Sequence, residues 1–150
     1  ADQIIISTRT SGGQTDTAGI SLFAIDANAE GVTVTSFPTV DGLYAAEEEL
    51  KDVRVPAGRL IGTLDEGFDI LQQVAIDGML ALCAEAVGAM EMLYKDTVAY
   101  TQEREQFDQA LSDFQVLQHR MVDMFMEYEQ SKSLLYMATI KNVEGSKERM

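Results

Sequence analysis

The chain has 150 residues, a hydrophobic fraction of 46% and a formal net charge of −14 at pH 7. This length and apolar content are typical of one ordinary folded domain and argue against disorder. The negative charge argues against a nucleic-acid binder and against an anionic membrane partner, because both partners require a basic protein face. No uninterrupted apolar run of about 18 residues is present, so we expect no membrane span.

The cysteine content and the first residues bear on location. Cys83 is the single cysteine, which excludes an internal disulfide and favours a reducing, cytoplasmic compartment. The chain begins ADQIIISTRT and lacks a basic leader followed by an apolar core, so we expect no signal peptide. The absence of a first Met leads us to expect a piece of a longer protein.

Residues 1–62 have the pattern of short β-strands. The apolar runs are Ile4–Ile6, Ile20–Ile25, Val32–Phe37 and Tyr44–Val55, with polar or glycine-containing turns between them. Turn signals about every ten residues are typical of an antiparallel sandwich or barrel. These strands are few for a closed β domain, so we predict a partial antiparallel sheet.

From Thr63 onward the apolar period becomes helical. Thr63 and Glu66 match a capping box, and apolar residues then recur at spacings of three and four. We predict helices over about residues 64–104 and 113–143, the second opened by a capping box at Ser112–Gln115.

Two long helices with a short connection pack as an antiparallel hairpin. The predicted fold class is therefore α+β, with residues 1–62 in part of a β domain and residues 63–150 in part of a helical bundle. A two-helix hairpin cannot bury both of its apolar stripes, so we expect other helices or subunits to cover them.

The connection between the predicted helices holds the strongest candidate site. Arg104 and Phe107 stand three residues apart, which would project a planar cation and an aromatic ring from one side of the helix end. Such a pair is suited to hold an anion together with a flat ring. A structural interpretation stays open for Arg104, because a cation near a helix C-terminus is favourable by about 0.3–1 kcal/mol without any ligand. Gln115 is likewise explained by its capping box alone.

The rest of the chain gives little sign of chemistry. It has no glycine-rich phosphate loop and no Cys/His cluster, so we assign no metal ligand. We interpret Asp77 as a solvated or capping carboxylate, Cys83 as a small core residue and His119 as a structural or interface residue. We assign no catalytic residue.

A longer pattern runs across the same connection. It reads R-x-Q-F and then F-Q-x-x-Q-H-R-x-x-D-M, carried by Arg104, Gln106, Phe107, Phe114, Gln115, Gln118, His119, Arg120, Asp123 and Met124. This pattern resembles the flavin-contacting signature of the acyl-CoA dehydrogenase family. Shorter pieces, among them Gly19–Phe23, Asp52–Pro56 and Ala84–Gly88, fall in the family's order.

The resemblance implies an FAD-dependent oxidoreductase of fatty acid metabolism that acts on a CH–CH bond. Members of the family oxidise an acyl-CoA thioester to its trans-2-enoyl-CoA, and an electron-transfer flavoprotein takes the electrons. By resemblance, Arg104, Gln106 and Phe107 contact the FAD, with Phe114 and Gln115 beside them. In the family these residues reach FAD bound largely by a neighbouring subunit, which implies an oligomer such as a dimer of dimers.

The chain departs from the family pattern at several positions. Where the family commonly has Gly after the motif's Phe, and Pro two residues further on, this chain has Asp108 and Ala110. Gly78 stands where some members carry the catalytic Glu, and other members carry the base in a segment that would follow Met150. We therefore expect a fragment that is inactive by itself.

Two further alternatives stay open from the sequence. The first is a non-catalytic oligomerisation module, or degenerate subunit, of the same fold. The stretches Cys83–Gly88 and Phe114–Arg120 are also similar to the small subunits of bacterial pimeloyl-CoA dehydrogenases, a subgroup of the family. That similarity leaves homo- and hetero-oligomers both open.

Overall fold

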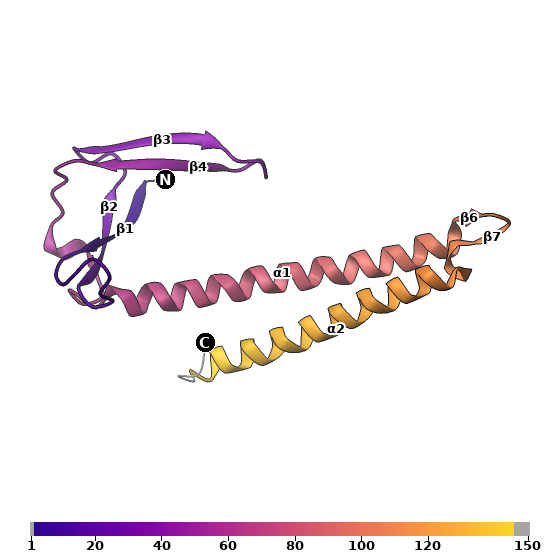
Figure 1. Cartoon of the computed structure of the whole chain (residues 1–150). Helices are drawn as coiled ribbons and strands as arrows, with labels where there is room; N and C mark the ends of the chain where they lie inside the picture. Colours follow the sequence, from indigo (N-terminus) through magenta and orange to yellow (C-terminus); the bar gives the residue numbers. More distant parts are fainter. Residues whose placement is uncertain (1, 146–150) are drawn as a thin grey trace. The chain divides into compact units, whose positions relative to one another are not determined.

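The computed structural model describes residues 2–145 (Figure 1). These residues form two compact units, which divide between Val74 and Ala75. Strands dominate the first unit, and two long helices form most of the second. This order of elements confirms the predicted α+β fold class.

A three-stranded antiparallel sheet forms the centre of the first unit. Its strand order is β1-β2-β5, with β1 at Gln3–Arg9, β2 at Ile20–Asp26 and β5 at Leu60–Ile61. The central strand β2 supplies the core of this unit, since Leu22 is 2% exposed and Ile25 is 3% exposed. Consecutive residues of β2 from Ile20 to Ile25 are buried or half-buried, so side chains on both faces of this strand are covered, which agrees with its nearly continuous apolar run.

A second antiparallel sheet consists of β3 (Val32–Pro38) and β4 (Tyr44–Leu50). The sequence predicted the fourth strand as far as Val55. The strand ends earlier because Asp52 has a φ of 55°, which extended backbone does not adopt. In the described residues neither sheet closes into a barrel, so the predicted partial antiparallel sheet is confirmed.

A polar network fixes the turn that precedes the first long helix. The hydroxyl oxygens of Thr10 and Ser21 lie 2.7 Å apart, and the Thr10 hydroxyl donates to a carboxylate oxygen of Asp65 at 2.6 Å. The backbone N–H of Asp65 donates to the Ser21 hydroxyl at 2.8 Å. Ser21 is fully buried, and a buried hydroxyl is costly unless it is hydrogen-bonded. The network therefore holds Asp65 in its left-handed conformation, with φ at 68°.

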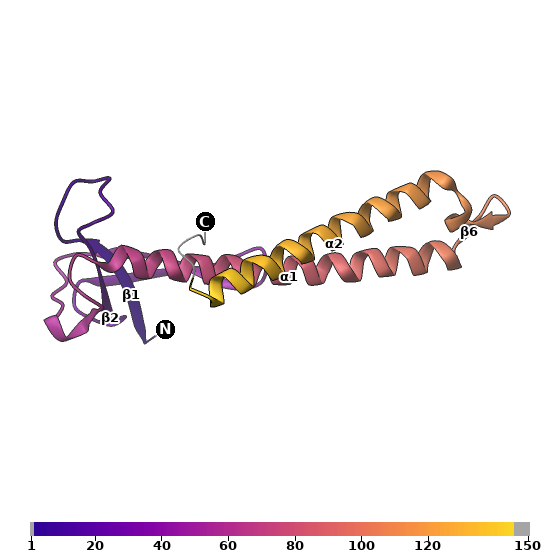
Figure 2. The same cartoon turned by 90° about the horizontal axis from the view of Figure 1, so that it is seen from below.

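The two long helices are α1 (Gly67–Glu103) and α2 (Gln115–Val143). Within the second unit they run antiparallel and side by side, as both views show (Figures 1 and 2). Contacts between them include Asn142 with Asp77, Tyr94 with Phe125 and Tyr128, and Thr101 with Met121. The predicted antiparallel two-helix hairpin is therefore confirmed.

Neither predicted capping box opens a helix. Helix α1 begins one residue after Glu66, so Thr63 does not occupy the N-cap position. Helix α2 has Phe114 as its N-cap residue, with no side-chain hydrogen bond to the helix end. Ser112 lies instead in a 3-10 turn, η2 (Leu111–Asp113). Both predictions are wrong because short turns occupy the residues that the capping spacing pointed to.

Much of the apolar surface of the two helices is exposed in this chain. Examples on α1 and α2 are Val74, Met79, Leu82, Leu93, Val116, Phe125, Leu134 and Met137. Cys83 is exposed as well, so its interpretation as a core residue is wrong within this chain. Faces of this kind need a partner element, as the sequence predicted.

Helix α1 also bears on the expectation of no membrane span. It contains an 18-residue window with a mean hydropathy of 1.4, and 6% of that window is buried. By length and composition alone, this helix meets the criterion for crossing a bilayer. The expectation rested on uninterrupted apolar runs, a stricter criterion that α1 does not meet. An apolar helix face that packs in a bundle passes the same composition test.

Candidate functional site

The two helices are joined by residues 104–114, which contain a small β-hairpin (Figure 1). Strand β6 (Glu105–Gln106) pairs antiparallel with strand β7 (Gln109–Ala110). Phe107 and Asp108 form the two-residue loop between them, with φ values of 57° and 60°. Positive φ at both central positions is the geometry of a type I′ hairpin turn.

This hairpin corrects the predicted position of Phe107. Because α1 ends at Glu103, Arg104 and Phe107 do not project from one side of a helix. The backbone N–H of Leu111 donates to the carbonyl of Arg104 at 2.8 Å and closes the base of the hairpin. Arg104 therefore lies at the base and Phe107 at the apex, about 10 Å apart by the rise of an extended strand.

The backbone conformation and the solvent exposure of Phe107 are both energetically unfavourable. The side chain is 86% exposed, and φ is positive. A left-handed conformation costs a residue with a Cβ about 1–2 kcal/mol, and exposure forgoes the stabilisation that burial of an aromatic ring provides. Its described ring contact is edge-to-face with Phe114, at a centroid distance of 6.3 Å. Strain that local contacts do not offset is typical of functional sites.

Arg104 is exposed at the base of the same hairpin. Within residues 2–145 its guanidinium makes no hydrogen bond or ion pair, and the ion pairs found there join Lys95 to Glu91 and Lys132 to Glu129. A guanidinium without a protein partner is available to an anion, and its planar fork suits carboxylate or phosphate oxygens.

The remaining predicted site residues lie on either side of the loop. The side-chain amide of Gln106 donates to the backbone carbonyl of Glu105 at 2.8 Å. Gln115 is the first residue of α2 and is exposed, while Phe114 directly before it is half-buried. The five residues thus share one short segment of the second unit, and their role in binding stays a prediction.

The hairpin also makes a prediction about stability at Ala110. This residue has φ −64° and ψ 145°, which is the conformation that proline adopts. It pairs with Glu105, next to the pair that closes the loop, so its N–H points away from the ladder. We expect Ala110→Pro to stabilise the protein by about 0.4–1 kcal/mol, because the unfolded chain loses conformational freedom. Urea denaturation measures this, and a loss of stability would show that the Ala110 N–H has a partner.

The other candidate residues, Asp77 and His119, add little to the candidate site. Asp77 accepts a hydrogen bond from the side-chain amide of Asn142 at 2.8 Å, so it joins α1 to α2 and is not the purely solvated or capping group that the sequence suggested. His119 is exposed on α2. In the part of the chain that the structure describes, no group of three His, Cys, Asp or Glu side chains is arranged to hold a metal ion.

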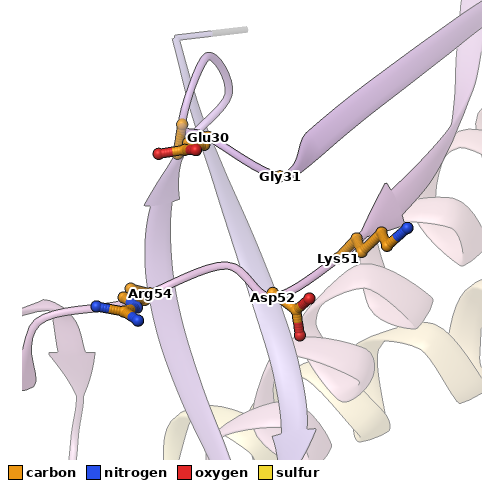
Figure 3. A pocket seen from close by; sticks show the side chains of 6 residues that line it. Glu30, Gly31, Lys51, Asp52 and Arg54 are labelled. Atoms are coloured by element: carbon orange, nitrogen blue, oxygen red, sulfur yellow. The ribbon is translucent and has the colours of Figure 1, made fainter.

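An open hollow of about 660 Å³ lies in the first unit, between the turn at Ala29–Gly31 and the residues that follow β4. Its charged lining residues are Glu30, Lys51, Asp52 and Arg54 (Figure 3). In Figure 3 these side chains point in different directions and do not converge on a common centre. Two cations and two anions that diverge do not form a site for one charged ligand, so the hollow is not a candidate site.

Comparison with known proteins decides the family. The model of the acyl-CoA dehydrogenase C-terminal domain matches residues 65–150, which include both long helices and the hairpin. The chain belongs to the acyl-CoA dehydrogenase family. A short-chain-specific acyl-CoA dehydrogenase from Megasphaera elsdenii is 31% identical over 130 residues, which cover 85% of this chain and 34% of that protein.

Solved structures of flavoproteins share this fold. Butyryl-CoA dehydrogenase from Megasphaera elsdenii matches with a TM-score of 0.84 and 29% identity, over 97% of this chain and 39% of its own. The structure of PigA with FAD and proline matches with a TM-score of 0.89 and 29% identity over the same shares. The chain thus spans about a third of the length of the curated family members that it matches.

Proposed function

We propose that this chain is part of an FAD-dependent acyl-CoA dehydrogenase that oxidises an acyl-CoA thioester to its trans-2-enoyl-CoA. The observation that carries the proposal is the hairpin between α1 and α2. It presents the exposed guanidinium of Arg104, which has no ion-pair partner among residues 2–145, and a strained, exposed aromatic ring at Phe107, in a chain of a flavoprotein family. FAD offers the matching chemistry, since it combines a pyrophosphate with flat rings.

The side chains in and beside the hairpin carry chemical groups that match those of this cofactor. Arg104 would neutralise pyrophosphate charge through charge-assisted hydrogen bonds. The Phe107 ring is exposed, so it would pack against one of the flat rings of the cofactor in an apolar contact. Gln106 and Gln115 carry amide groups that donate and accept hydrogen bonds, and Phe114 supports the Phe107 ring from its edge.

When bound, FAD would supply the acceptor for the β hydrogen of the substrate as a hydride, and a carboxylate base would be needed for the α proton. The chain itself supplies no assigned base, because glycine at position 78 has no side chain to accept a proton. Its contribution is to hold and orient the cofactor. We therefore expect the 150-residue chain to be inactive alone.

The proposal extends to partners. The subunit of a caffeyl-CoA reductase–Etf complex from Acetobacterium woodii is 29% identical over 125 residues, which supports an electron-transfer flavoprotein as the electron acceptor here. The exposed apolar faces of α1 and α2 support assembly into a homo- or hetero-oligomer, with a dimer of dimers expected. We propose a cytoplasmic location, in keeping with the single cysteine.

A non-catalytic oligomerisation module of the same fold is the second candidate. The exposed apolar faces favour it equally, since they would serve assembly whether or not a flavin is bound. Gly78 favours it further, because no base is present at that position.

The absorbance spectrum of the purified full-length protein separates the two candidates. A flavoenzyme will show flavin absorbance that bleaches when an acyl-CoA is added without an electron acceptor, because the flavin is reduced. A short-chain substrate such as butyryl-CoA is the first to test. A colourless protein that does not take up added FAD would overturn the flavoenzyme proposal and leave the module.

A further inference from the structure

The apex of the hairpin carries a carboxylate next to the exposed aromatic ring. Asp108 directly follows Phe107, is exposed and has a φ of 60°. Within residues 2–145 its carboxylate is found in no ion pair. The negative charge of Asp108 is therefore not neutralised by a neighbouring cation in the described part of the chain.

The whole connection is acidic. From Thr101 to Phe114 there are four acidic residues and one basic residue, a net charge of 1 − 4 = −3, from Glu103, Glu105, Asp108, Asp113 and Arg104. Asp108 lies at the apex of the hairpin and Arg104 at its base, so the rise of strand β6 places the two residues about 10 Å apart. The Debye length is also about 10 Å at 0.1 M ionic strength, so an anion held by Arg104 would feel this carboxylate.

We infer that Asp108 lowers the affinity of the hairpin for the pyrophosphate of FAD and so sets how firmly the cofactor is held. The inference rests on the proposed function, because it concerns the same cofactor. Two like charges about 10 Å apart in water repel weakly, and the pyrophosphate carries about two negative charges, so the effect is roughly two- to fivefold in affinity. Because exposed charges are screened by salt, the effect disappears at high ionic strength.

Asp108→Asn in the full-length protein tests this inference. Asn has the same shape and tolerates the left-handed conformation, so the hairpin is retained, which the thermal unfolding midpoint verifies. The dissociation constant of FAD is measured by flavin fluorescence at low salt and at about 0.5 M salt, where screening is strong. Glu85→Gln is the control, since Glu85 is exposed on α1 about 28 Å along the helix axis from Arg104, where its repulsion of an anion at Arg104 is much weaker.

We expect Asp108→Asn to tighten FAD binding about two- to fivefold at low salt and not at high salt, with little change for Glu85→Gln. Equal affinities for the wild type and Asp108→Asn would overturn the inference, and so would an equal gain in the control. Arg104→Ala, measured alongside, distinguishes a failure of this inference from a failure of the proposed function. If it weakens FAD binding while Asp108→Asn has no effect, the inference fails and the proposed function stands. If it has no effect, both fail.

Discussion

Arg104→Ala in the full-length protein is expected to weaken FAD binding about 10- to 100-fold. The reason is that a hydrogen bond to a charged group contributes about 1.5–3 kcal/mol, and about 1.4 kcal/mol corresponds to a tenfold change in affinity. The guanidinium has no ion-pair partner within residues 2–145, so its removal leaves no protein group unpaired in that part of the chain. The measurement is a titration of the apoprotein with FAD, followed by flavin fluorescence.

Two further variants make this result specific. Arg104→Lys keeps the charge but loses the planar fork, so we expect an affinity between those of the wild type and the alanine variant. Lys95→Ala removes one positive charge from α1 about 13 Å along the helix axis from Arg104. Its ion pair with Glu91 is exposed and contributes little to stability. Only the long-range attraction of this charge is lost, so FAD binding should weaken by far less than the tenfold or more expected for Arg104→Ala. A matching loss of affinity in the Lys95 variant would show that only total charge matters.

The strands and helices could be predicted because their signals are local. The apolar runs that became β2 and β3 stand between turn residues, and the stripes on α1 and α2 repeat at the helical period over many turns. Periodicity over a long segment outweighs any single residue. The fold class therefore followed from the sequence, and the resemblance to a family followed from the motif across the connection.

The hairpin inside that connection could not be predicted in the same way. Type I′ turns are recognised in a sequence by Asn-Gly or Asp-Gly, whereas this loop is Phe107-Asp108 and contains no glycine. The capping spacing at Ser112 and Gln115 pointed to a helix start, but a 3-10 turn occupies Ser112. The candidate site residues were thus proposed from a motif, while the position of Phe107 at a hairpin apex and of Arg104 at its base required the structure.

The network before α1 was missed for a different reason. It joins Thr10 to Asp65, 55 residues later in the sequence, and no local pattern connects the two. Each residue alone has an ordinary turn interpretation. A hydroxyl inside an apolar run, as at Ser21 in β2, is the one signal in the sequence that a buried polar contact is present.

The same network predicts a large loss of stability for Gly19→Ala. A Cβ at this position would lie 2.2 Å from the carbonyl oxygen of Ser11, and the backbone has a φ of 84°. The N–H of Gly19 also donates to the carbonyl of Asp65 at 2.9 Å, so a shift of this backbone would disturb the turn before α1. We expect a loss of about 2–5 kcal/mol in the free energy of unfolding, as the sum of left-handed strain and overpacking.

Two other glycines of the first unit separate these two causes. Gly42 has nearly the same φ, 82°, but a Cβ there would meet nothing within 4 Å, so Gly42→Ala should cost only the left-handed strain of about 1–2 kcal/mol. Gly58 has open space and no positive φ, so Gly58→Ala should be neutral or slightly stabilising. Urea denaturation of the three variants gives the contribution of the clash as the difference between positions 19 and 42. Equal losses at these two positions would show that the Ser11 carbonyl moves aside at no cost, and that the turn before α1 is not held as firmly as its hydrogen bonds indicate.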